Sequence, residues 1–104
     1  MYTNKLEKKL SEIKELISIA RKAGYVIIGQ DTLKSYTKKL YAILIDKSAG
    51  DALKHSMNFL AQERQIPLFE IDRLNDLVSI EKCKVIGIKN KVLCESIERC
   101  LKGE

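Results

Sequence analysis

The sequence predicts an α/β fold in which helices cover both faces of a central sheet. Segments with apolar residues at steps of three and four, which are typical of amphipathic helices, alternate along the 104 residues with short apolar, β-prone runs. The resulting order, α-β-α-β-α-β-α-β-α, is the pattern of a layered α/β domain. No linker, repeat or low-complexity stretch interrupts this order, so we expect one domain over residues 1–104.

The first expected helix begins after Asn4, a candidate N-cap, and ends at Gly24. The short run Tyr25–Ile28 that follows is β-prone and predicts the first strand. The apolar residues that would form the inward face of the helix are Leu6, Leu10, Ile13, Ile17 and Ala20.

Gly29 breaks the first strand, and a second helix is expected over Gln30–Lys39. Its apolar stripe would combine Leu33 and Leu40 with Tyr36 or Thr37 between them. The continuous apolar run Tyr41–Ile45 suits a strand that is buried on both faces, and a turn over residues 46–50 follows it.

The second half of the chain repeats the alternation. A third helix, with Leu53, Met57 and Leu60 on one side, is followed by a strand that starts at Pro67, and Asn90 is a candidate N-cap for the last helix. The elements expected here are helix Asp51–Arg64, strand Pro67–Ile71, short helix Arg73–Ile80, strand Val85–Ile88 and a helix from Asn90 to Lys102.

The charge balance favours a polyanionic partner. The formal net charge is +5 at pH 7, and the four lysines from Lys82 to Lys91 occur with no acidic residue among them.

Apolar runs are shorter than the roughly 18 residues of a membrane span, and the first ten residues are too polar for a signal peptide. We therefore expect a cytoplasmic protein with no membrane contact.

Motifs for catalysis, metal binding and nucleotide binding are absent from the sequence. There is no G-x-G-x-x-G, Walker-type G-K-[ST], G-x-S-x-G or H-E-x-x-H motif. Cys83, Cys94 and Cys100 include no C-x-x-C pair and read as reduced side chains, and the single histidine, His55, falls within an expected helix. We expect no cofactor, no metal and no enzymatic activity.

One ordered set of motifs resembles a known family. The segment Ile17–Asp46 contains Ile19-Ala20-Arg21-Lys22-Ala23-Gly24, a Gly29-Gln30-Asp31 turn, Lys34 and an apolar strand that leads to an acidic turn. Ile66-Pro67-Leu68, Ser79-Ile80-Glu81 and Val85–Ile88 continue the pattern. This set resembles the ribosomal-protein L-seven-Ae / L-thirty-e superfamily of kink-turn RNA-binding proteins, and most of all its small stand-alone bacterial (YlxQ-like) branch.

The resemblance implies a three-layer α-β-α sandwich with a central mixed four-stranded sheet. It also implies binding of structured, kink-turn-like RNA, with ribosomal RNA as the expected target and a role at the ribosome in translation. The RNA site would combine the start of the second helix with the loop before the last strand. The residues carried over one at a time are Gly29, Gln30, Asp31, Lys34, Lys38, Ile80, Glu81, Lys82 and Lys84.

The chain departs from the family pattern at three motif positions, and its segment between the expected second helix and second strand is shorter than in the family. Gln30-Asp31 stands where well-studied members carry Asn-Glu, Ser35 stands at the family's lysine position with Lys34 one place early, and Ser79 replaces a loop glycine. Three candidates also have a purely structural explanation: Gly29 as a turn glycine, Asp31 as a first-turn acid and Lys34 as a solvated lysine.

Two other functions compete with RNA binding. A protein-interaction module of the same fold would have lost the RNA site, and its partner, or a second copy of the chain, would bind the long N-terminal helix. A small enzyme would use Asp46 or Asp51, which otherwise read as residues that form the turn and cap the third helix.

Overall fold

The computed structural model describes residues 5–102, and the side chains of residues 11–102. Within this range, helices and strands follow one another in the expected alternation. The elements are α1 (Lys5–Lys22), β1 (Val26–Ile28), α2 (Gln30–Ser35), β2 (Ala42–Asp46), α3 (Asp51–Arg64), β3 (Leu68–Ile71), α4 (Leu74–Val78), β4 (Val85–Ile88) and α5 (Lys91–Lys102). The strands lie within one residue of the expected limits, which is the usual uncertainty of an element's end.

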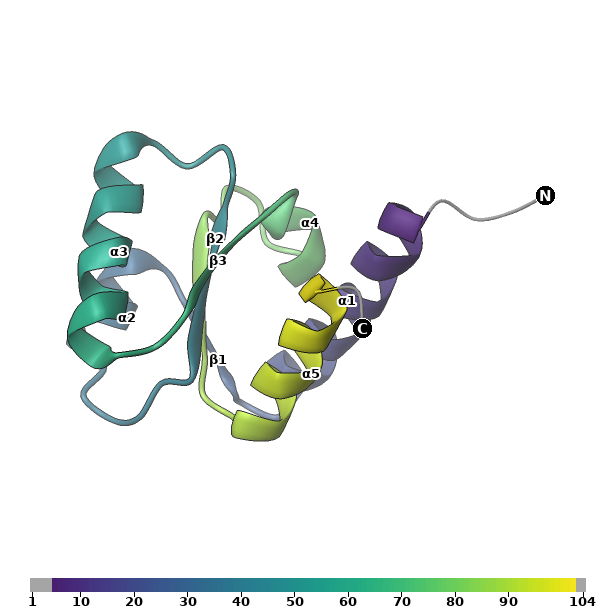
Figure 1. The fold of residues 1–104 in the computed structure, drawn as a ribbon, viewed down its shortest axis with the longest axis horizontal. Helices are drawn as coiled ribbons and strands as arrows, with labels where there is room; N and C mark the ends of the chain where they lie inside the picture. The colour runs from purple at the N-terminus through teal and green to yellow at the C-terminus, as the bar shows by residue number, and fades with distance from the viewer. Residues whose placement is uncertain (1–4, 103–104) are drawn as a thin grey trace.

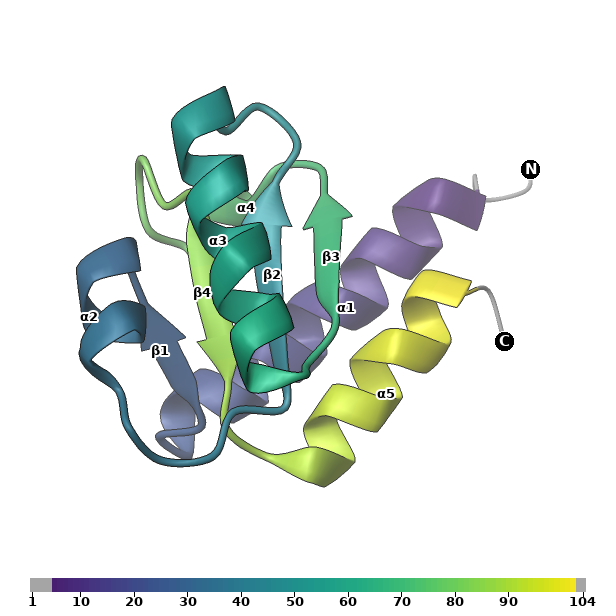
Figure 2. The same cartoon turned by 60° about the vertical axis from the view of Figure 1, so that its left-hand side comes forward.

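The four strands form one mixed sheet in the order β1-β4-β2-β3. Strand β4 lies antiparallel to β1 on one side and to β2 on the other, whereas β2 and β3 are parallel. Helices α2 and α3 cover one face of the sheet, and α1, α4 and α5 cover the other (Figures 1 and 2). This arrangement confirms the expected three-layer α-β-α sandwich with a mixed four-stranded sheet.

Each face of the sheet has its own apolar core. In β2, Ala42 and Leu44 pack with α1, α4 and α5, whereas Ile43 and Ile45 pack with α2 and α3. All five residues of β2 are buried, which explains why its sequence is a continuous apolar run rather than an alternation.

The C-terminus of α1 and the N-terminus of α5 are capped by the residues that the sequence predicts. Gly24 adopts a φ of +80°, and the Tyr25 N–H donates to the Ala20 carbonyl at 2.8 Å, which closes the C-terminus of α1. The Asn90 side chain accepts a hydrogen bond from the Leu93 N–H at 3.0 Å and caps α5. The expected cap Asn4 and the inward side chains of Leu6 and Leu10 lie outside the described residues.

Helix α2 is shorter than the sequence predicts. It ends at Ser35 rather than Lys39, because Tyr36 has extended backbone angles and its N–H bonds to the Leu33 carbonyl at 3.3 Å. The chain then continues in an extended connection to β2. In this connection Leu40 is only 2% exposed and packs in the core between the sheet and helices α2 and α3. Lys38 therefore lies outside α2, and the expected helix end at Lys39 was wrong.

Helix α4 and the cap of α3 also differ from the prediction. The helix expected over Arg73–Ile80 spans only Leu74–Val78, because Arg73 and Ser79 on either side of it adopt left-handed backbone angles. Gly50, not Asp46 or Asp51, is the N-cap residue of α3, and no side chain caps that helix. The turn over residues 46–50 is present as expected.

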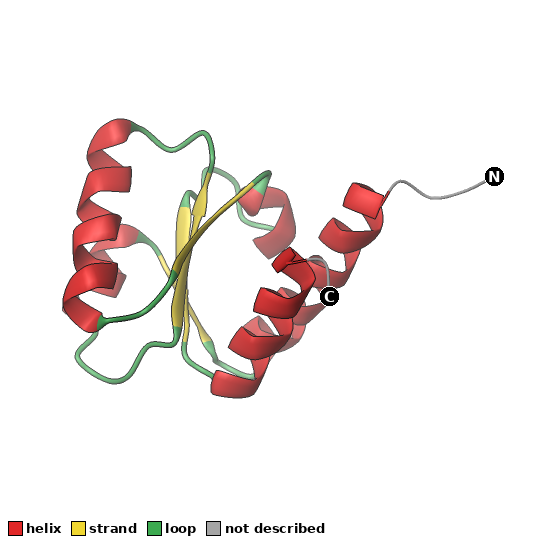
Figure 3. Cartoon of the chain, viewed as in Figure 1, coloured by secondary structure: helices red, strands yellow, loops and turns green. Residues whose placement is uncertain are grey.

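The connections between elements gather at two opposite edges of the sheet (Figure 3). One edge holds the carboxyl ends of β1, β2 and β3, and the other holds the carboxyl end of β4. Among the described helices, none is long and apolar enough to cross a membrane.

Candidate nucleic-acid interface

A groove of about 320 Å³ lies at the edge of the sheet where β1, β2 and β3 end. It is formed by two segments that are about 50 residues apart in sequence: the start of α2 and the loop between α4 and β4. Leu53 of α3 forms part of the wall between them. The lining residues are Ile28, Gly29, Gln30, Leu53, Ile80, Glu81, Lys82, Cys83, Lys84 and Val85.

Gly29 fixes the start of α2 against the sheet. Its φ of +95° and ψ of 150° lie in a region that residues with a Cβ atom rarely adopt, although the space around it is open. Its N–H donates to the Val85 carbonyl at 3.2 Å, which joins the turn after β1 to the first residue of β4. The expected role of this glycine as a turn residue is thereby explained by its backbone angles.

The loop between α4 and β4 is shaped by two left-handed residues. Ser79, with φ at 59°, stands where the resemblance places a glycine, and Lys82 has φ at 60°. The Ile80 N–H donates to the Asn75 carbonyl at 3.0 Å, and the Arg21 guanidinium donates to the Val78 carbonyl at 2.7 Å. These contacts hold the loop against the end of α4 and assign Arg21 a structural contact rather than a free surface charge.

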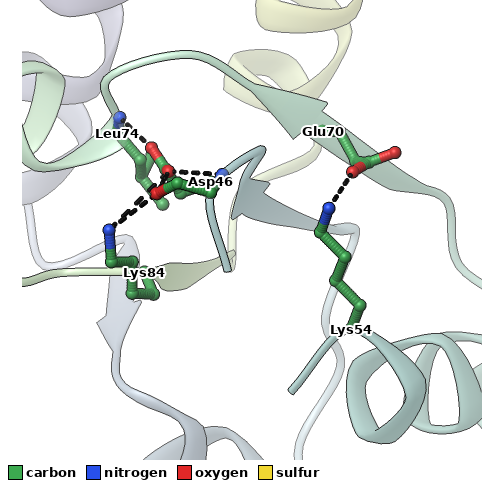
Figure 4. A network of polar contacts seen from close by, with 6 residues as sticks. Asp46, Lys54, Glu70, Leu74 and Lys84 are labelled. Carbon is green, nitrogen blue, oxygen red and sulfur yellow. Dashed lines mark hydrogen bonds and ion pairs between the residues drawn. The ribbon is translucent and has the colours of Figure 1, made fainter. Parts of the chain in front are cut away.

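The buried carboxylate of Asp46 joins the loop to the rest of the fold (Figure 4). Only 4% of Asp46 is exposed, and its oxygens accept hydrogen bonds from the Leu74 N–H at 2.9 Å, the Ser48 N–H at 2.8 Å and the Ser48 hydroxyl. Lys84 donates to the Ser48 hydroxyl at 2.7 Å, and its Nζ lies 3.8 Å from the carboxylate. Asp46 thus caps α4 and positions Lys84.

The pKa of Asp46 predicts a change of stability with pH. Burial would raise this pKa, but hydrogen bonds from Ser48 and the Leu74 N–H, together with the charge of Lys84, outweigh burial and hold it below its ordinary value of 3.8. A depressed pKa stabilises the fold above the pKa of the unfolded chain, and that contribution is lost as the pH falls through the folded-state value.

Asp46→Asn should therefore be less stable than the wild type at about pH 6 and should approach it at about pH 3. Urea unfolding of both proteins at the two pH values measures the difference. Asp51→Asn is the matched control, because Asp51 is exposed and, among the described residues, accepts no side-chain hydrogen bond that fixes another element. A difference between wild type and Asp46→Asn that stays constant with pH would show that the carboxylate charge does not contribute.

The structure brings together most of the site residues predicted from sequence. Those that line the groove are Gly29, Gln30, Ile80, Glu81, Lys82 and Lys84. Asp31 and Lys34 are exposed on α2 beside the groove without lining it. Lys38 lies in the connection after α2, and its carbonyl accepts a long hydrogen bond of 3.5 Å from Arg64 at the end of α3.

The lysines around the groove differ in how far their charges are neutralised. Lys84 is paired with Asp46, so part of its charge is already balanced. Lys34 and Lys82 are exposed, and within the described side chains neither forms an ion pair. These two lysines are the ones available to an anionic ligand.

Of the two buried cysteines, Cys83 lines the groove, whereas Cys94 of α5 contacts the Tyr41 carbonyl at the opposite edge of the sheet. Cys83 and Cys94 are buried free thiols, and burial raises the pKa of both. No group of three or more His, Cys, Asp or Glu side chains in the described part of the chain is placed to hold a metal ion. Leu53 was expected only as a core residue of α3, and its half-buried position in the groove wall gave no signal in the sequence.

Comparisons with solved structures establish the fold. A protein of unknown function from Bacillus halodurans superposes with a TM-score of 0.76 at 16% identity, over 88% of this chain and 97% of that chain. A 15.5 kD RNA-binding protein from Giardia lamblia superposes with a TM-score of 0.61 at 16% identity, over 99% of this chain and 90% of that chain. No family model and no curated protein sequence matches the chain.

Proposed function

We propose that this protein is a non-enzymatic, single-domain RNA-binding protein that recognises structured RNA through the groove between α2 and the α4–β4 loop. The observation that carries the proposal is the meeting of these two segments in one groove, because the family resemblance implicates the same two segments. The fold shared with an RNA-binding protein of Giardia lamblia supports the same reading.

The groove and the exposed residues of α2 beside it combine polar, apolar and cationic side chains, which a distorted RNA requires. Gln30 and Asp31 offer an amide and a carboxylate that can bond to exposed base edges, and an acceptor such as Asp31 suits a guanine N–H. Ile80 is a half-buried apolar side chain on which an extruded nucleotide can pack. Lys34 and Lys82 supply charge for phosphates. A regular A-form major groove is too narrow for such contacts, so we propose a kinked RNA as the ligand.

The proposed setting is the cytoplasm, with ribosomal RNA as the target and a role in translation. A net charge of +5 and the absence of a cofactor motif fit a binding role rather than a catalytic one. Asp46, the buried carboxylate that an enzyme could have used, is instead occupied in four contacts that hold the fold together.

A titration against two RNAs tests this proposal. One RNA contains a kink-turn with tandem G·A pairs, and the other has those pairs replaced by Watson–Crick pairs. Both are measured at about 50 and 200 mM salt, because affinities for RNA depend steeply on salt. We expect a clear preference for the kinked RNA at both salt concentrations. Equal, weak binding of the two RNAs would contradict kink recognition and would favour the protein-interaction alternative, with a partner or a second copy bound to α1.

A further inference from the structure

A second basic surface lies at the edge of the sheet opposite the groove. Three connections meet there: the one between α2 and β2, the one after α3 and the one between β4 and α5 (Figure 2). Hydrogen bonds from the Tyr41 N–H to the Ile88 carbonyl at 2.9 Å and from the Lys89 N–H to the Tyr25 carbonyl at 2.8 Å hold this edge together. The basic residues of this "lower edge" are Lys38, Lys39, Arg64, Lys89 and Lys91.

Three of these cations share one hollow. Lys39 of the α2–β2 connection, Arg64 at the end of α3 and Lys91 at the start of α5 line a hollow of about 460 Å³. Its remaining lining is mainly apolar or uncharged and consists of Leu40, Tyr41, Gln65, Ile66 and Pro67. The hollow therefore contains converging positive charge and no acidic side chain.

The charges of the lower edge are not balanced within the chain. Among residues 11–102, none of its five cations forms an ion pair with an acidic side chain. Four other lysines of the described chain do form such pairs, namely Lys47, Lys54, Lys84 and Lys102. Repulsion among these unpaired positive charges lowers the stability of the folded chain. An external anion bound at the lower edge would reduce that repulsion.

Two tyrosines hold lysines of the lower edge in place. The Lys89 ammonium lies 5.3 Å from the centre of the Tyr36 ring, and the Lys39 ammonium lies 5.5 Å from the centre of the Tyr41 ring. A lysine lies over one face of each ring, and both tyrosines are partly buried against the apolar cores, so the rings are poorly placed to stack on an unpaired base. This arrangement suits the phosphates of a duplex better than the bases of a single strand.

We propose that the lower edge binds the phosphate backbone of duplex RNA, as a second contact separate from the groove. The choice of RNA among polyanions rests on the proposed function, but the charge arrangement does not depend on kink recognition. Lys84 and Lys89 flank the two ends of β4, and five residues of extended chain span about 17 Å. The two surfaces would therefore contact different parts of an RNA, and Lys38 would belong to this contact rather than to the groove.

The test uses a plain 20-base-pair RNA duplex without a kink, titrated against the full chain at several salt concentrations. Lys39→Gln/Lys91→Gln is compared with Lys14→Gln/Lys102→Gln, which changes the net charge equally at exposed positions on α1 and α5. We expect the first pair to weaken binding about tenfold at about 50 mM salt and to lower the salt slope by about two, and the control pair to change neither appreciably.

Three results would overturn the proposal: no binding of the duplex at low salt, equal loss in both double variants, or no loss in Lys39→Gln/Lys91→Gln. Equal loss would mean that only the net charge matters, and no loss would mean that the surface serves another partner. Failure of kink recognition leaves this result unaffected, because the plain duplex contains no kink.

Discussion

Replacing Leu33 with alanine is expected to lower the free energy of unfolding by about 2–5 kcal/mol, the usual cost of truncating a fully buried leucine. Leu33 is 0% exposed and is the only buried residue of α2. Its side chain packs directly over Gly87 of β4, where a Cβ atom would collide with it. Because α2 has this single anchor, the substitution should also loosen the start of α2 and weaken RNA binding through the groove.

Urea unfolding measures the first effect, and RNA titration at a temperature where the variant is folded measures the second. Leu33→Met is the control, because a swap that conserves volume usually costs less than about 1.5 kcal/mol. If Leu33→Ala unfolds like the wild type, α2 is not anchored by this residue. If Leu33→Ala is destabilised but binds kinked RNA with full affinity, the groove is not the RNA site.

Reversing two charges beside the groove should have the largest effect on RNA binding. Lys34→Glu/Lys82→Glu is expected to weaken binding of the kinked RNA about a hundredfold at about 50 mM salt, because it would remove the two proposed phosphate contacts and add repulsion. Both lysines are exposed and form no ion pair within the described side chains, so the fold should be unchanged.

The matched control for this variant is Lys14→Glu/Lys102→Glu, which makes the same change of net charge away from both basic surfaces. It should retain affinity within a few-fold. An equal loss in both variants would show that attraction is general rather than located at the groove. Lys84 is left out of the variant, since its contacts with Asp46 and Ser48 would make a loss of binding inseparable from a loss of stability.

The order of helices and strands was predictable because burial imposes clear periods on the sequence. Helix α3 and strand β4 have the expected limits, since each is bounded by turn residues and carries a strong apolar pattern. The unbroken apolar run of β2 predicted a strand covered on both faces, and α2, α3 on one side and α1, α4, α5 on the other provide that cover.

The end of α2 was not predictable from its own residues. Leu33, Tyr36 and Leu40 are spaced as on one face of a helix, but only Leu33 lies in α2, which ends at Ser35. Leu40 is buried in an extended segment, and Tyr36 contacts Lys89, which is about 50 residues away in sequence. Tertiary contacts of this kind override a local helical pattern, and they place Lys38 in the connection after α2 rather than on the helix.

The candidate groove was predictable only in part. The family resemblance placed Gly29 and Ile80 in one site, and the structure brings them together. The hydrogen bond from the Leu74 N–H to Asp46, which fixes the start of α4, joins residues 28 positions apart and has no local signature. The same is true of the lower edge, whose cations come from segments far apart in sequence that only the folded chain brings together.

The central claim is that α2 and the α4–β4 loop act together as one RNA interface. Amide chemical shifts of ¹⁵N-labelled protein, followed during addition of the kinked RNA, test it directly. We expect the amides of Gly29 and Gln30 to shift together with those of Glu81 and Lys82, and the same amides to shift much less with the Watson–Crick-paired RNA. Shifts confined to other parts of the chain, with these four amides unchanged, would contradict the claim.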